Sequence, residues 1–458
     1  MNDSRPNIVL VTIDALRAKN LGCLGYSRNT APHLDGLAER GILYSKAFSN
    51  GPTTPFSFPS IMTSVYPLML SDIGLPESGL RTIAEVLKEQ GYATAAWHPN
   101  PFISSAYNYD RGFDVFKDPE SWSSQKERVR LGVTRHTKKW PKIHRFARSI
   151  NNKLFRRTFS FAQKTAGQIV DAASSWIAER HQPYFVWMHF NDTHHPWYPK
   201  KNYLGRFRSK SLSPKKAKKL VDKLKKNPDN IWENIRPGEM ADIIDLYDSE
   251  IAYTDDMLGR FFDSAVDLEN TIVFVTSDHG EEFGEHGGFH RNKPYDEMIH
   301  VPLIIAGGDL PQGQKIDAQL PLIDLPPTIL EVCGIPKPPE FLGSSLTHRV
   351  DEEHKERAVY VEYNRRLLDG ENYEGETLAL RKNGWKYIKR ESGEELYHLE
   401  TDPGEKINLL HQEPDTAREM RSELDDHILF LNENRIDVAR VELDEKLKQT
   451  LKGLGYID

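Results

Sequence analysis

Short apolar runs alternate with segments of helical periodicity over the first three quarters of the chain. Runs of strand length occupy residues 8–13, 93–97, 184–190, 271–276 and 301–306. Helical patterns occupy residues 32–40, 82–90, 169–180, 243–265 and 325–332. Runs that are apolar at successive positions are typical of strands buried on both faces. The alternation therefore predicts an α/β fold, with a large mixed, mostly parallel sheet and helices on both of its faces.

A different pattern follows a charged, linker-like stretch at residues 343–355. Short strand-like segments at residues 358–363, 378–381, 385–389 and 395–399 precede a long amphipathic pattern at residues 415–431. Strands this short and closely spaced predict an antiparallel sheet. Since 458 residues are too many for one ordinary core, we expect a large domain over residues 1–345 and a smaller α+β subdomain over residues 356–458.

Positive charge is concentrated in two stretches, although the formal net charge is -7. Residues 125–157 contain twelve Lys and Arg against one Glu, and residues 200–226 contain twelve against one Asp. These stretches predict surface inserts near residues 120–165 and 200–235. The inserts could be plain solvated faces, or a rim that gathers a polyanionic glycan or lipid headgroup and touches a membrane surface. We predict no specific nucleic-acid partner.

The cysteines and the length of the apolar runs indicate whether the protein has disulfides, a membrane span or a signal peptide. The only two cysteines, Cys23 and Cys333, form no disulfide framework and are expected to be buried free thiols. No apolar run approaches the ~18 residues of a membrane span. Residues 8–13 are too short for a signal-peptide core. These features predict a cytoplasmic protein.

Acidic residues and histidines follow three of the predicted strands. They are Asp14 after residues 8–13, Asp192, His194 and His195 after residues 184–190, and Asp278 and His279 after residues 271–276. The carboxyl ends of parallel strands meet at one edge of a sheet, where active sites of such folds lie. One carboxylate at a strand end is often a helix cap, but three such ends favour metal binding. Residues 277–290 (SDHGEEFGEHGGFH) strengthen this interpretation with four acidic residues and three histidines.

These segments resemble the sulfatase family of the alkaline phosphatase superfamily. The resemblance is carried by residues 5–14 (RPNIVLVTID), 21–26 (LGCLGY), 31–35 (APHLD), 276–280 (TSDHG), 301–305 (VPLII), 378–381 (LALR), 385–388 (WKYI) and 395–405 (ELYHLETDPGE). It runs from about residue 6 to about residue 417 and omits mainly the basic inserts. It implies an alkaline-phosphatase-like catalytic domain, an α+β C-terminal subdomain and metal-dependent hydrolysis or transfer of phosphate or sulfate esters.

Residues 51–64 (GPTTPFSFPSIMTS) are similar to the family's nucleophile segment. Family sulfatases begin this motif with a Cys or Ser that becomes formylglycine, and Thr54 stands at that position. Phe56 and Phe58 stand where the family has Pro and Arg, and Ser57 is interpreted as a structural hydroxyl. Threonine is not converted to formylglycine, whose sulfated hydrate expels sulfate by elimination. The resemblance therefore favours a phosphoester and a threonine nucleophile.

The resemblance also implies a ligand set for one divalent metal ion, which could be Mn, Mg, Ca or Zn. The implied ligands are Asp14, Thr54, Asp278 and His279, while the second Asp of many sulfatases is Ala15 here. A two-metal site that recruits Asp192, His194 and His290 is the less favoured alternative.

The remaining site residues are carried over in the same way. His194 matches the family histidine beside the leaving-group oxygen and is predicted to be the general acid. His290 and Lys293 stand where basic residues contact the non-bridging oxygens of an anionic ester substrate, and His98 and Asn100 follow a strand near the same face. His195 and His286 are predicted to be supporting or surface histidines.

Two other functions stay open. One is a genuine sulfuric ester hydrolase, which works despite Thr54. The other is a non-catalytic relative that binds polyanions through the basic inserts, as the absence of an Asp at Ala15 and of an Arg at Phe58 suggests.

Overall fold

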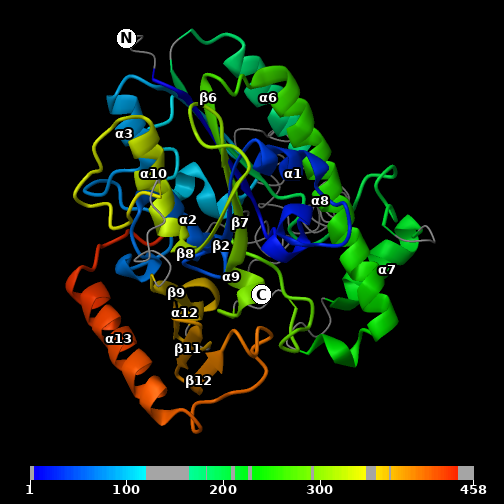
Figure 1. Cartoon of the computed structure of the whole chain (residues 1–458), viewed down its shortest axis with the longest axis vertical. Coiled ribbons are helices and arrows are strands. Elements are labelled where there is room, and N and C mark those ends of the chain that lie inside the picture. The colour runs from blue at the N-terminus through cyan, green and yellow to red at the C-terminus, as the bar shows by residue number, and fades with distance from the viewer. Residues whose placement is uncertain are drawn as a thin grey trace, which may run out of the picture.

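A sheet of eight strands runs through the larger part of the protein, in the order β4-β3-β5-β1-β6-β7-β2-β8 (Figure 1). The computed structural model describes residues 5–119, 165–181, 183–207, 212–224, 230–289, 293–346, 357–370 and 373–441. Strand β7 is antiparallel to both of its neighbours, and the other pairs are parallel. The strands are β1 (Asn7–Ile13), β2 (Gly41–Phe48), β3 (Ala93–Trp97), β4 (Val115–Lys117), β5 (Tyr184–Phe190), β6 (Thr271–Thr276), β7 (His300–Ala306) and β8 (Gln314–Pro321).

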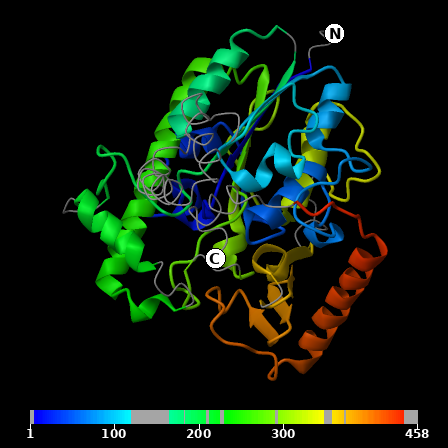
Figure 2. The same ribbon diagram turned by 180° about the vertical axis from the view of Figure 1, so that it is seen from behind.

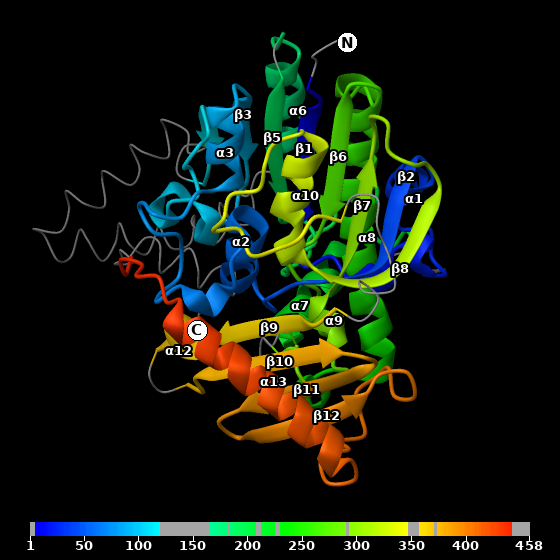
Figure 3. The same ribbon diagram turned by 60° about the vertical axis from the view of Figure 1, so that its left-hand side comes forward.

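Helices cover both faces of this sheet, because the central strands are apolar on both sides. Along β1, Ile8 and Leu10 pack into one core cluster, and Val9 and Val11 pack into another on the opposite face. The first face carries α2 (Thr54–Thr63), α3 (Ile83–Glu89) and α10 (Leu325–Val332), and the second carries α1 (Pro32–Glu39), α6 (Ala166–Ile177) and α8 (Pro237–Ala265) (Figure 3). The predicted fold class is confirmed.

Several elements differ from the sequence-based expectation. Strands β2, β4 and β8 were not predicted. In β2, Ser45 and Lys46 interrupt the apolar pattern next to a register shift. Strand β8 is an edge strand with several polar residues. Helix α8 begins before the predicted position. Helix α6 also begins earlier, where the Gln168 side chain accepts a hydrogen bond from the Thr165 backbone N–H (3.3 Å).

A second sheet lies next to the large one (Figure 2). It has four antiparallel strands in the order β12-β11-β10-β9 (Figure 3). Its strands are β9 (Val359–Asn364), β10 (Glu376–Lys382), β11 (Trp385–Arg390) and β12 (Gly393–His398), and α12 (Arg365–Asp369) and α13 (Pro414–Glu433) complete this part. Helix α13 lies across the sheet (Figure 3) and buries Met420 and Leu424 against Leu380 and Tyr387. The predicted boundary between residues 345 and 356 falls mainly on residues outside the described ones and stays a prediction.

The structure describes part of the second basic insert and almost none of the first. The first, near residues 120–165, lies almost wholly outside the described residues. In the second, α7 (Pro214–Leu224) buries one apolar face, and its Lys216 and Lys223 pair with Asp242 (2.7 Å) and Glu239 (2.5 Å) of α8. Part of this positive charge is therefore neutralised within the protein.

Both cysteines are free, as predicted, with Cys333 buried and Cys23 partly buried. No helix among the described residues is both long and apolar enough to cross a membrane.

Candidate active site

The order of the sheet brings three chemically active strand ends together. Strand β1 pairs with β5 on one side and with β6 on the other, so residues that follow these strands meet at one edge. The Asp14 backbone N–H donates to the carbonyl oxygen of Phe190, the last residue of β5 (2.8 Å). On the other side, the Ala15 backbone N–H donates to Oδ1 of Asp278 (3.3 Å).

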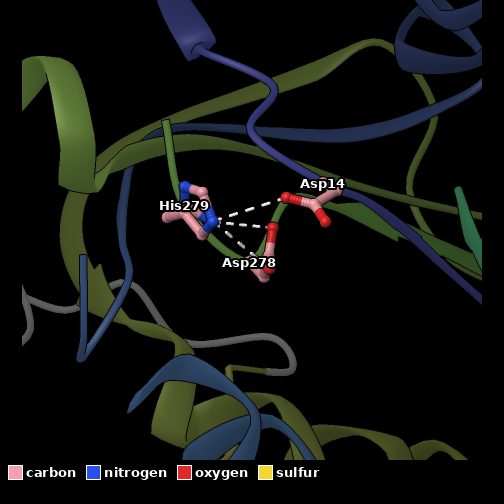
Figure 4. A group of neighbouring side chains, drawn as sticks. All are labelled: Asp14, Asp278 and His279. Atoms are coloured by element: carbon pink, nitrogen blue, oxygen red, sulfur yellow. Dashed lines mark hydrogen bonds and ion pairs between the residues drawn. The ribbon is translucent and has the colours of Figure 1, made fainter. Parts of the chain in front are cut away.

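Asp14, Asp278 and His279 form a buried cluster, in which their side chains point toward one another (Figure 4). His279 Nε2 lies 3.4 Å from Asp14 Oδ1 and 3.7 Å from Asp278 Oδ2. The residues are at most 1% exposed, so their charges interact with little screening by solvent.

The three groups shift one another's pKa values in opposite directions. Burial alone would raise the pKa of Asp14, but the charges of His194, His189 and His279 outweigh it and hold the pKa below its ordinary value. Burial and the charge of Asp14 raise the pKa of Asp278. Burial lowers the pKa of His279, but the two aspartates more than offset this and raise it.

The donor atoms of this cluster fit a divalent cation. His279 Nδ1 lies 2.8 Å from the carbonyl oxygen of Gly280 and donates to it, so Nε2 is the nitrogen that faces the two carboxylates. A ring nitrogen fixed to a backbone carbonyl, with its partner nitrogen aimed at carboxylates, is the usual arrangement of a metal-ligating histidine. One ligand atom of each residue lies within 4.8 Å of the others. Two carboxylates and an imidazole suit Zn²⁺, Mn²⁺ or a similar ion.

Thr54 lies beside this cluster at the first position of α2. Its hydroxyl donates to Asp278 Oδ2 (2.8 Å), and Asn100 Nδ2 lies 3.4 Å from its oxygen. The same Asn100 Nδ2 donates to Asp14 Oδ2 (3.0 Å). Thr54 is fully buried, and the positive end of the α2 dipole lies at its position. The four residues implied as metal ligands are thus neighbours.

The rest of the nucleophile segment is structural packing. Phe56 contacts Tyr363 edge to face, and Phe58 packs against Trp187 and His189 at ring-centroid distances of 5.4 and 5.1 Å. The Ser57 hydroxyl is hydrogen-bonded within its own segment, to backbone carbonyls and to Ser49. No described contact joins Ser57 to Asp278.

His194 follows β5 and lies on the side of His279, with ring centroids 6.5 Å apart. It is 3% exposed and stacks on His195 at 4.8 Å. Its Nδ1 lies 2.5 Å from the His195 carbonyl oxygen and donates to it, so Nε2 is the ring nitrogen on the side away from that carbonyl. His195 is therefore placed to hold the ring of His194 in position.

The other predicted site residues have contacts of their own or lie outside the described part. His98 is buried between Trp187 and Phe116, where burial lowers its pKa to about 3. Lys293 Nζ donates to the carbonyl oxygen of His286 (2.9 Å) and lies 3.3 Å from Glu282 Oε1. His290 lies outside the described residues.

The two-metal alternative gains no support from Asp192. Its Oδ2 accepts the backbone N–H of Ala166 at the start of α6 (2.9 Å). Burial raises the pKa of Asp192 to about 7.

Sequence reasoning missed His189 of β5. Its Nε2 lies 3.5 Å from Asp14 Oδ2, and its Nδ1 lies 2.9 Å from the Thr12 hydroxyl. The available signal was a titratable residue in an otherwise apolar strand, one position before Phe190. His189 therefore braces Asp14 from the side of β5.

Comparison with known proteins identifies the family. The sequence pattern of the sulfatase family (Sulfatase) matches residues 6–335, and that of the N-sulphoglucosamine sulphohydrolase C-terminal region matches residues 284–434. Arylsulfatase K of Xenopus laevis is 25% identical over 463 residues, covering 92% of this chain and 82% of the relative.

Two solved structures share the fold. A protein in complex with its substrate D-glucosamine-2-N,6-O-disulfate has a TM-score of 0.70 at 18% identity, covering 94% of this chain and 99% of its own. The phosphonate monoester hydrolase of Agrobacterium radiobacter has a TM-score of 0.68 at 18% identity, covering 96% and 99%. The family pattern spans the sheet, the acidic strand ends and the Thr54 segment alike, and the chain belongs to the sulfatase family.

Proposed function

We propose that this sulfatase-family hydrolase cleaves, or transfers, an anionic phosphate or sulfate ester through attack by the Thr54 hydroxyl. The observation that carries the proposal is the 2.8 Å hydrogen bond from Thr54 Oγ1 to Asp278 Oδ2, beside Asp14 and His279. A hydroxyl that already donates to a carboxylate has a base in contact with its proton. The N-terminus of α2 at the same point favours a negatively charged group.

Asp14, Thr54, Asp278 and His279 would hold the divalent cation. When bound, that ion would lower the pKa of the hydroxyl and offset negative charge on the ester. Asp278 receives the hydrogen bond of the hydroxyl and orients its oxygen. Asn100 holds Asp14 and Thr54 in fixed relation through one amide group.

The reaction runs in two displacements. Thr54 Oγ1 gives its proton to Asp278 Oδ2 and forms a bond to phosphorus or sulfur, while the bond to the leaving oxygen breaks and His194 Nε2 supplies the proton to that oxygen. A water molecule, which gives a proton to His194 Nε2, then attacks the threonine ester. The bond to Oγ1 breaks, and Oγ1 regains its proton from Asp278, which restores the hydroxyl. Transfer results when an alcohol takes the place of water in this second step.

The choice between phosphorus and sulfur is the finer part of the proposal. A threonine ester has no elimination route of the kind that a formylglycine hydrate has, which favours a phosphoester released by direct displacement. The name of the curated relative, arylsulfatase, favours a sulfate ester. Sulfate ester hydrolysis is therefore the second candidate. The disulfated glucosamine bound by a related structure points to an anionic sugar as one class of substrate.

A panel of aryl esters tests the proposal. Aryl sulfate, aryl phosphate monoester and aryl phosphate diester are offered to the purified protein with added Mn²⁺ or Mg²⁺. Thr54→Val, which keeps the shape and removes the hydroxyl, is expected to lower turnover of the preferred ester roughly a thousandfold or more. The ranking of the three esters decides between phosphorus and sulfur.

Thr53→Val is the matched control. Thr53 is the neighbouring threonine, and its buried hydroxyl has no hydrogen-bond partner among the described residues. We expect this variant to keep its activity. Full activity in Thr54→Val, or selective loss in Thr53→Val, would refute the assignment. No turnover of any ester and no bound ion would favour the non-catalytic, polyanion-binding alternative.

A further inference from the structure

A second group of metal-ligating side chains lies apart from the Thr54 site. Glu282 and His286 belong to the loop that follows Asp278 and His279, and Glu297 belongs to the short helix α9 (Asp296–Ile299). One ligand atom of each of these three residues lies within 4.8 Å of the others. Glu282 is fully buried, and the side chains of His286 and Glu297 are only 10% and 8% exposed.

Glu282 uses only one of its two carboxylate oxygens. Oε1 accepts the backbone N–H groups of His286 (3.2 Å) and Gly288 (3.0 Å) and lies 3.3 Å from Lys293 Nζ. Oε2 is buried and receives no hydrogen bond from any residue that the structure describes. Burying a carboxylate oxygen without a hydrogen-bond partner costs more free energy than burying an uncharged polar atom without one. Burial and the nearby charge of Glu297 both raise the pKa of Glu282. A cation bound at this oxygen would offset that cost.

His286 is oriented as a ligand of such a cation. Its Nε2 donates to the carbonyl oxygen of Glu405 (3.0 Å), and its ring stacks on Tyr295 at 3.5 Å. The other nitrogen, Nδ1, therefore points at Glu297 Oε1, 2.5 Å away, with a proton between them. A dication can replace that proton, which then leaves to solvent. Metal-ligating histidines commonly have one nitrogen fixed by a backbone carbonyl and the other on the ion.

We propose that Glu282, His286 and Glu297 form a second site, which binds a divalent transition-metal ion of the Zn²⁺ type. An imidazole with two carboxylates suits Zn²⁺ better than Ca²⁺ or Mg²⁺, which prefer all-oxygen ligand sets. The ion ties the loop after His279 to α9. Through His286, it also ties that loop to Glu405, which follows the C-terminal sheet. The role of this site is to stabilise the loop that directly follows Asp278 and His279.

The test is a Zn²⁺ titration of the full-length protein after removal of metal with a chelator. The Thr54 site is first disabled with Asp14→Asn and Asp278→Asn together, so that any remaining ion reports on the second group. We expect calorimetry and elemental analysis to find one Zn²⁺ per chain in this double variant. Addition of Glu282→Gln is expected to weaken that binding by at least about 10- to 100-fold.

Glu285→Gln is the matched control, because Glu285 lies in the same loop but pairs with Arg17 (2.8 Å) instead of the cluster. It is expected to keep the Zn²⁺. If Glu282→Gln fails to fold by circular dichroism, Glu297→Gln gives the same comparison. A further readout is the melting temperature of the double variant, which Zn²⁺ should raise with concentration. Absence of Zn²⁺ binding in the double variant, or equal binding with Glu282→Gln or Glu297→Gln, would overturn the proposal.

Discussion

The Thr54 hydroxyl donates a 2.8 Å hydrogen bond to Asp278 Oδ2, although 224 positions separate the two residues. The contact exists because α2 begins at Thr54 on the same side of the sheet edge at which β6 ends. Each residue is buried; Thr54 is the first residue of α2, and Asp278 lies two positions after the end of β6.

Asn100 is expected to position the nucleophile. Asn100→Ala removes the amide that donates to Asp14 and lies near Thr54. We expect kcat to fall about 10- to 100-fold, as for other groups that orient ligands of a metal site. Steady-state kinetics measures the change, and thermal unfolding checks the fold, because Asn100 Oδ1 also accepts the Phe102 backbone N–H. An unchanged kcat in a folded variant would contradict this role.

The loss of hydrolysis rate in His194→Ala is expected to depend on the leaving group of the ester. His194→Ala should slow hydrolysis of an alkyl ester by about 10²- to 10⁴-fold, because an alkoxide needs a proton to leave. A p-nitrophenyl ester should be affected far less, since nitrophenolate leaves without one. His195→Ala is the comparison variant: it removes the ring stacked on His194 and a contact with Phe289 but keeps the backbone carbonyl that accepts from His194 Nδ1. It should therefore slow the alkyl ester less than His194→Ala does. Equal losses on both esters in His194→Ala would rule out the acid role.

Activity is expected to depend on a divalent ion at Asp14, Asp278 and His279. Treatment with a chelator should abolish turnover, and addition of Mn²⁺, Mg²⁺, Ca²⁺ or Zn²⁺ in turn should show which ion restores it. Asp14→Asn keeps the shape of the site but removes a charge. It should raise the metal concentration for half-maximal activity by at least about 10-fold. Turnover that survives complete chelation would contradict the ligand assignment.

Asp255 gives a prediction for folding stability. It accepts the backbone N–H groups of His33 and Leu34 at the start of α1, and burial raises its pKa to about 7. The folded protein therefore binds a proton here more tightly than the unfolded chain does. This group's contribution to stability is present below about pH 4 and is lost as pH rises toward 7. From pH 5 to pH 7 the loss is about 2–3 kcal/mol.

Asp255→Asn should flatten that pH dependence, which urea unfolding at pH 5, 6, 7 and 8 would measure. Asp256→Asn is the neighbouring control, since the Asp256 side chain is 31% exposed. It should reduce the pH dependence only slightly, because burial is the largest cause of the raised pKa of Asp255 and the charge of Asp256 is a smaller one. If Asp255→Asn had the same pH dependence as the unaltered protein, burial would not govern this carboxyl.

The central part of the fold was predictable because its signal is local. Strands β1, β5 and β6 are apolar at nearly every position, and a strand of this kind is recognised without knowledge of its partners. Strands β2 and β8 were missed because their polar residues interrupt the apolar pattern. They are stabilised as strands by pairing, β2 with β7 and β8 with β2. Pairing between distant segments is not encoded in any short window of sequence.

The site was predictable to the same extent. Asp14, Asp278 and His279 follow recognisable strands, and Thr54 was placed by resemblance to the family. His189 was missed because a histidine within an apolar strand is usually an ordinary core residue. The partners of Lys293 could not be foreseen either, because its direction depends on the fold of the loop that contains Glu282.

The central position of β1 has a consequence for folding during synthesis on the ribosome. This strand is made early, but the strands on either side of it, β5 and β6, begin 177 and 264 residues after its first residue. At ~5–20 residues per second, the ribosome needs on the order of 10 to 50 seconds to deliver both. Throughout that interval the apolar β1 segment has neither of its partner strands, and its backbone hydrogen-bonding groups lack their pairs. Synthesis of this enzyme should therefore depend on chaperones that bind exposed β-segments.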